Sequence, residues 1–156
     1  MTRINSAIPV RKLTDEHLLA EHREIKRLPY CLNRSIASGS INRIQKRFTL
    51  GMGHVTFFLD KQRFLFNRYL EIYNECLKRG FSVQSFASNW SDISDIYNRD
   101  YKPTEEEYKL LIERICERIW KSNKSCWHYY GNKITKEEAI RLLCGGRYCL
   151  LHAGEN

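Results

Sequence analysis

The chain has 156 residues, of which 42% are hydrophobic, so it can form one compact domain with a buried core but not a second domain of ordinary size. Its net charge of +8 favours a polyanion such as nucleic acid as partner, and +6 of this excess lies in residues 1–50. The absence of an 18-residue apolar run and of a secretory signal excludes a membrane span, and we expect a soluble, cytoplasmic protein.

The first predicted helix extends from Thr14 to Gly39. Thr14 can cap its N-terminus, two acidic residues suit its first turn, and apolar residues recur at helical spacing along its length. Pro29 lies inside this pattern, and we expect it to kink the helix rather than end it.

A second helix is predicted over about residues 54–79, where an apolar stripe ends at Gly80. A third begins after Thr104 with a capping box and an apolar stripe, and a last short helix follows Thr135. No segment shows the sustained alternation typical of strands. The sequence therefore predicts an all-α fold: a single compact domain of three long helices with long connecting loops and a short C-terminal helical extension.

One edge of the first helix concentrates charge. His17, Glu21, Glu24 and Arg27 are spaced three or four residues apart, and Arg23 lies on the flank of this edge. Such an edge is either a solvated surface or a site where carboxylates are held among cations.

The N-terminus offers a nucleophile. Thr2 is small enough for the initiator methionine to be removed, which would expose a primary amine with a pKa of roughly 7.7–8.0. A neutral amine can attack the sugar carbon of a nucleoside and form an imine, as lysines do in other enzymes. The alternative is an N-terminal arm with no chemical role.

Several spaced motifs carry a family resemblance. They are MTRIN at residues 1–5, HLLAEHRE at 17–24, GHVTFFLDK at 53–61, ECLKRGF at 75–81, RDYKP at 99–103 and WHYYG at 127–131. In this order they resemble the pyrimidine-dimer DNA glycosylase (endonuclease V) family, and the likeness covers roughly residues 1–131. Residues 132–156 have no recognised counterpart, so we expect a glycosylase-like domain over 1–131 and an extension of unknown role over 132–156.

The resemblance implies a DNA N-glycosylase with lyase activity at abasic sites. Its substrate would be double-stranded DNA containing a cyclobutane pyrimidine dimer or an abasic site. Thr2 would be the nucleophile, and Glu24 would be the essential carboxylate that stabilises the developing sugar cation and assists the proton transfers of β-elimination. No cofactor and no metal are expected, and we expect a monomer.

The resemblance also implies a set of DNA contacts, because guanidinium groups suit phosphate oxygens. The matching positions are Arg3, His17, Arg23 and Arg27, with Arg114 and Arg118 as further basic contacts on the third helix. His22 departs from the family pattern, which usually has an aromatic residue before the Arg-Glu pair.

Four alternatives remain open. The enzyme could use the same mechanism on another modified base, or the chain could be a DNA-binding relative without catalysis. The segment from Gly51 to His54 could cradle phosphate or pack. The rings of Trp127, Tyr129 and Tyr130 could stack on DNA or pin the C-terminal segment to the helices.

Zinc binding is a weaker possibility. Four of five residues near the C-terminus could form a tetrahedral site, although their spacing matches no strong zinc pattern. These residues are Cys126, His128, Cys144, Cys149 and His152.

Overall fold

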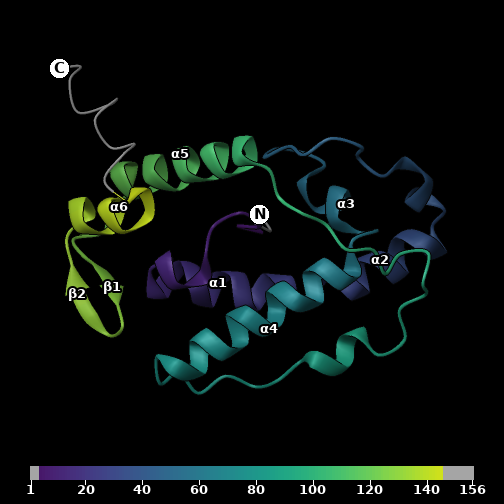
Figure 1. Ribbon diagram of the computed structural model, residues 1–156, viewed down its shortest axis with the longest axis horizontal. Coiled ribbons are helices and arrows are strands. Elements are labelled where there is room, and N and C mark those ends of the chain that lie inside the picture. Colours follow the sequence, from purple (N-terminus) through teal and green to yellow (C-terminus); the bar gives the residue numbers. More distant parts are fainter. Residues whose placement is uncertain (1–3, 146–156) are drawn as a thin grey trace.

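The computed structural model describes residues 4–145 and shows a mostly helical protein (Figure 1). Its α helices are α1 (Asp15–Ile25), α2 (Leu28–Ala37), α3 (His54–Phe58), α4 (Gln62–Lys78), α5 (Glu105–Lys121) and α6 (Lys136–Cys144). Short 3-10 helices occur at Val10–Lys12, Ser40–Arg43 and Ala87–Trp90, and strands β1 (Trp127–Tyr129) and β2 (Asn132–Ile134) form an antiparallel hairpin. The helical class is therefore confirmed in outline, whereas the hairpin was not predicted.

The first predicted helix is two helices, so the expected kink at Pro29 is wrong. Thr14 caps α1 as predicted, by accepting a hydrogen bond from the His17 amide. The helix ends at Ile25, and Pro29 lies in the first turn of α2. A proline there loses no helical hydrogen bond, whereas inside a continuous helix its ring would clash with the carbonyl group four residues earlier. The chain therefore begins a new helix before the proline.

The second predicted helix is also divided, into α3 and α4. The first amides of α4 do not donate their hydrogen bonds to carbonyl groups of α3. Instead the Gln62 amide donates to the Tyr97 carbonyl at 3.0 Å, and the Phe64 amide donates to the Arg99 carbonyl at 3.3 Å. A separate helix start is stabilised by this distant loop, because the first amides of a helix have no partner within it.

Helices α1 and α4 lie side by side and form the centre of the molecule (Figure 1). Their facing side chains, among them Leu18, Ile25, Leu65 and Ile72, are fully buried. The connection over residues 81–103 packs along α4 and places Trp90 against Tyr69, with ring centroids 5.0 Å apart. This long segment is therefore held by the core.

The C-terminal hairpin and α6 belong to the same core. The turn between the strands uses positive φ angles at Tyr130 and Gly131, the conformation that closes a two-residue hairpin. Helix α6 has the predicted capping box of Thr135 with Glu138 and packs on α5. Its Leu143 is fully buried. Among the described residues, no helix is both long and apolar enough to cross a membrane.

Candidate active site

The N-terminal arm is anchored to α1 through a buried ion pair. The Glu21 carboxylate receives two hydrogen bonds from Arg68, at 2.9 and 3.1 Å, and neither side chain is more than 4% exposed. The same carboxylate accepts the Asn5 amide at 3.2 Å and the Asn5 side-chain amide at 2.9 Å. Arg68 also donates to the Ile8 carbonyl at 2.6 Å. One charged pair thus fixes the arm at two points.

A third anchor comes from the first residue of α3. The Ile4 amide donates to Nε2 of His54 at 3.0 Å, while Nδ1 of His54 lies 2.8 Å from the Thr49 carbonyl. Nε2 must accept and Nδ1 must donate, so this geometry requires the neutral imidazole with its proton on Nδ1. His54 and Ile4 are both buried. Within the segment from Gly51 to His54, it is His54 that packs in the core and positions the arm, whereas Gly51 and Met52 are exposed.

Glu24 lies one turn beyond Glu21 on α1 and has a different environment. Its side chain is 30% exposed, and its carboxylate accepts a hydrogen bond from Arg27 at 3.4 Å. A carboxylate that is partly accessible and paired with a cation can approach a substrate without leaving a buried charge behind. Thr2 and Arg3 lie outside the described residues.

The predicted basic contacts fall on two elements. Arg23 and Arg27 are exposed at the C-terminal end of α1, and Arg118 is exposed on α5. Arg114 is half-buried, and its guanidinium donates to the Leu50 carbonyl at 3.2 Å. This bond ties α5 to the turn that precedes His54, so Arg114 lies close to the anchored arm.

His17 is held as a neutral ring. It stacks on Trp127, with ring centroids 5.1 Å apart and an angle of 5° between planes, and its Nδ1 lies 2.7 Å from the Thr14 hydroxyl. Burial lowers the pKa of His17 to about 4, against the opposing charge of Glu16, and the cations Lys124 and Arg118 lower it further. At neutral pH this ring therefore carries no charge.

The His22 ring packs among aromatic side chains, in the position where the resemblance leads one to expect an aromatic residue. His22 is buried, and its ring centroid lies 5.8 Å from that of Tyr69, 6.5 Å from that of Tyr73 and 6.2 Å from that of Phe86. Burial lowers its pKa, as do the cations of Lys26 and Arg23, so the imidazole is neutral. The His22 side chain is therefore part of the buried core.

Arg79 is a residue that sequence reasoning missed. Its buried guanidinium donates to Asp15 and to Glu75, at 2.9 Å each, and lies 4.6 Å from the Tyr130 ring centroid and 5.0 Å from that of Tyr129. The Tyr130 hydroxyl donates to Glu75 at 2.7 Å. Although burial raises the pKa of Glu75, the bonds from Tyr130 and Arg79 bring it below its ordinary value.

The aromatic hairpin is therefore pinned to the helices. Trp127 is buried against His17, and the tyrosine rings pack on Arg79. Asp15 accepts the backbone amides of Tyr130 and Gly131 at 3.1 and 2.8 Å. Of the two roles considered for these rings, the observed contacts favour pinning. In the sequence, Arg79 resembled only an ordinary cation at a helix C-terminus.

Among residues 4–145, no group of three or more potential metal ligands is close enough to hold an ion. Cys149 and His152, two members of the zinc set considered above, lie outside the described residues. The Sγ atoms of Cys116 and Cys144 are 3.4 Å apart in the core between α5 and α6.

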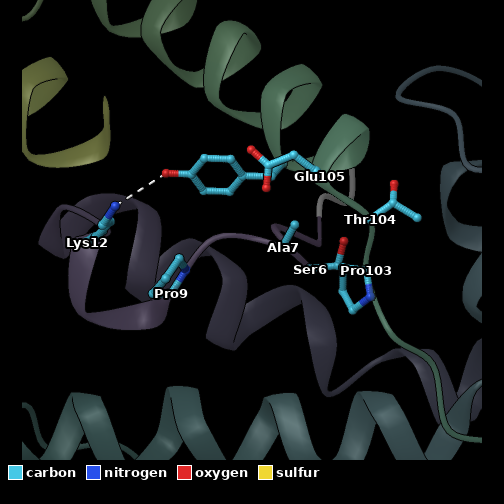
Figure 2. Close-up of a pocket in the computed structure, with 8 residues that line it drawn as sticks. Ser6, Ala7, Pro9, Lys12, Pro103, Thr104 and Glu105 are labelled. Carbon is cyan, nitrogen blue, oxygen red and sulfur yellow. Dashed lines mark hydrogen bonds between the residues drawn. The ribbon is translucent and has the colours of Figure 1, made fainter. Parts of the chain in front are cut away.

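An open pocket of about 410 Å³ lies between the arm and the start of α5 (Figure 2). It is lined by polar and apolar residues including Ser6, Pro9 and Thr104, and Lys12 bridges it with a 3.3 Å bond to the Tyr108 hydroxyl. Glu24 does not line this pocket, and its partly exposed side chain lies on the charged edge of α1.

A family model described as pyrimidine dimer DNA glycosylase matches residues 1–89. The matched segment contains the arm, its three anchor points and the charged edge of α1. Because the match covers more than half of the 156 residues, this chain belongs to the pyrimidine dimer DNA glycosylase family.

Proposed function

We propose that this protein excises cyclobutane pyrimidine dimers from double-stranded DNA and nicks the strand, using the α-amine of Thr2 as nucleophile and Glu24 as its carboxylate partner. The observation that carries the proposal is the fixed N-terminal arm. Asn5 is bonded to Glu21, one turn before Glu24 on the same edge of α1.

The direction of the arm supports this pairing. The described part of the arm runs antiparallel to α1 (Figure 1), so from Ile8 back to Ile4 the chain runs in the direction of the C-terminal end of α1, the end on which Glu24 lies. Two residues of extended chain span roughly 7 Å at most, so the Ile4 anchor limits how far an amine at residue 2 can lie from this edge. Such positioning raises the effective concentration of a nucleophile.

The chemistry requires removal of Met1. The neutral amine of Thr2 attacks C1′ of the damaged nucleoside, an N–C1′ bond forms, and the bond between C1′ and the base breaks. Opening of the sugar ring gives an imine. A proton then leaves C2′, the C3′–O bond breaks, and the 3′ phosphate departs.

Glu24 assists this sequence in two ways. Its negative charge stabilises the oxocarbenium character at C1′, and its carboxylate can accept the C2′ proton. The exposed Arg23 and Arg27 beside it would hold the phosphates that flank the lesion. Binding of one protein molecule per lesion needs no partner subunit, and we propose that it acts as a monomer.

Strand nicking tests the proposal. Processed protein is incubated with duplex DNA that contains one thymine dimer, and with duplex DNA that contains one abasic site. Wild type should nick both, and Glu24→Gln should nick neither. Glu137→Gln, which changes an exposed glutamate on α6, serves as the matched control and should retain full activity.

The two substrates separate the alternatives. Nicking at the abasic site without any action on the dimer would keep the amine mechanism and reassign the lesion to another modified base. Full activity of Glu24→Gln would contradict the role of this carboxylate. Inactivity of the processed wild type on both substrates would leave a DNA-binding relative without catalysis.

A further inference from the structure

The turn before α3 carries one fully exposed apolar side chain, that of Met52. Met52 is 99% exposed, more than any other large hydrophobic residue in the part of the chain that the structure describes. It stands between two glycines, and even a Cβ added at Gly51 would meet only open space. Met52 therefore contributes nothing to the core and projects fully into solvent.

The base of this turn is rigid. The Thr49 carbonyl is bonded to His54, and the Leu50 carbonyl to Arg114 on α5. Gly53 has φ +95°, and the Gln45 side chain lies 3.3 Å from where its Cβ would be, so the closing residue must be glycine. A turn held at these points keeps Met52 outward rather than letting it fold onto the protein.

The turn adjoins the candidate active site. His54, which holds the Thr49 carbonyl, also holds the Ile4 amide. The segment leading into the turn is strongly basic, because Arg43, Lys46 and Arg47 are all exposed. An apolar tip on a basic surface, beside the arm, is chemically suited to a polyanion with an apolar interior, which is what duplex DNA is.

We propose that Met52 is an intercalating wedge: its side chain enters the base stack beside the lesion and separates neighbouring bases. This inference rests on the proposed function, since it takes duplex DNA as the partner. Architectural DNA-binding proteins insert apolar side chains, including methionine, between base steps and thereby kink the duplex. The flexible, unbranched thioether can fit an irregular gap in a damaged stack.

The basic residues around the turn supply the affinity, and Met52 supplies the distortion. Phosphate contacts position a protein on DNA without unstacking any base. Once the stack is opened at the lesion, the C1′ atom becomes accessible to the amine on the neighbouring arm. Loss of Met52 should therefore affect reaction on duplex DNA and spare reaction on single strands, in which no stack has to be opened.

The test uses full-length processed protein and a duplex with a tetrahydrofuran abasic analogue, with 2-aminopurine as the base next to it. Unstacking raises 2-aminopurine fluorescence. Wild type and Met52→Leu should raise it, whereas Met52→Gln, which has similar length but is polar, should lose most of the rise. Ile96→Gln changes another exposed apolar residue and is the matched control.

A second readout separates the wedge from the proposed function. Nicking at a true abasic site in duplex DNA should fall about tenfold or more in Met52→Gln, while nicking in single-stranded DNA stays within about twofold of wild type. Unchanged fluorescence and duplex nicking in Met52→Gln would overturn the wedge and leave the enzyme assignment intact. They would then point to a protein partner for this tip. Failure of processed wild type to nick the abasic duplex would instead remove the proposed function, and the wedge with it.

Discussion

Glu21 and Glu24 lie three residues apart on the same edge of α1, and the protein places them in opposite environments. The Glu21 carboxylate is fully buried and bonded to Arg68 and Asn5. The Glu24 carboxylate is partly exposed and lies 3.4 Å from the exposed guanidinium of Arg27. One carboxylate holds the arm in place, and its neighbour remains accessible to substrate.

Glu21→Gln should destabilise the fold strongly. The substitution removes the buried counter-charge of the Arg68 guanidinium and leaves only the exposed Glu71 at 4.0 Å, which costs about 3–5 kcal/mol of unfolding free energy. Urea denaturation of wild type and variant measures the difference. Glu24→Gln, at the partly exposed position, should change it by less than about 1 kcal/mol. Equal losses in the two variants would contradict the division of roles.

His54→Phe should separate positioning from binding. Phenylalanine keeps the ring packing but removes the acceptor for the Ile4 amide, so the arm loses one anchor. We expect the rate of nicking at a saturating enzyme concentration to fall about tenfold, with the affinity for DNA nearly unchanged. Single-turnover kinetics and a binding titration supply the two values. A loss of affinity with an unchanged rate would show that His54 serves the DNA surface instead.

The neutral state of His17 predicts acid sensitivity. Because its folded pKa is about 4 and an unfolded histidine has a pKa of about 6.5, the unfolded state binds the proton first as pH falls. The stabilisation is complete above pH 6.5 and is lost as pH drops toward 4, by on the order of 2 to 3 kcal/mol. His17→Phe keeps the stack on Trp127 and cannot titrate. Wild type should therefore lose more stability than His17→Phe between pH 7 and pH 4, and parallel pH profiles would contradict the assignment.

Arg79→Lys should loosen the aromatic hairpin. Lysine cannot reproduce the forked bonds to Asp15 and Glu75 or the planar contact with the Tyr130 ring, so we expect a loss of about 2–3 kcal/mol. Amide hydrogen exchange should report faster exchange at Tyr130 and Gly131, whose amides bond to Asp15. Unchanged exchange at these two amides would show that the hairpin is held by other contacts.

Neutralising Arg23 and Arg27 should reduce the salt dependence of DNA binding. Each phosphate contact removed lowers the slope of log K against log salt concentration by about 0.9. The double variant Arg23→Gln and Arg27→Gln should lose close to twice that value. Arg141→Gln, an exposed arginine on α6, is the control. A slope as steep as that of wild type would place the DNA contacts elsewhere.

Local signals in the sequence were sufficient to predict where α5 and α6 begin and where α6 ends. Thr104 and Thr135 cap these helices, and Gly145 ends the second of them in the left-handed conformation. Only Thr135 forms the full capping box, because the Glu107 carboxylate accepts the Tyr101 hydroxyl instead of reaching back to Thr104. Capping depends on residues three positions apart, so it can be recognised without knowledge of the rest of the fold.

The helix breaks depended on distant partners and could not be predicted in this way. The start of α4 is stabilised by carbonyl groups of Tyr97 and Arg99, more than thirty residues away. The hairpin was missed because each strand has only three residues, too few for alternation to be visible.

For the candidate site, the sequence placed the charges on the correct edge of α1 but could not assign their roles. Glu21 and Glu24 are equivalent in spacing, and only the position of Arg68 on α4 distinguishes them. Likewise, His17 was expected to contact DNA from the resemblance alone, and its neutral state results from burial under Trp127, a residue 110 positions later in the chain.

The central claim, that the α-amine of Thr2 is the nucleophile, is tested most directly by trapping the imine. Processed protein is incubated with abasic-site duplex DNA and borohydride, the adduct is digested, and the modified peptide is identified by mass spectrometry. The account predicts a single adduct at the N-terminal amine of the peptide that begins with Thr2, and no adduct with protein that retains Met1. An adduct on a lysine side chain, or equal trapping by protein that retains Met1, would contradict it.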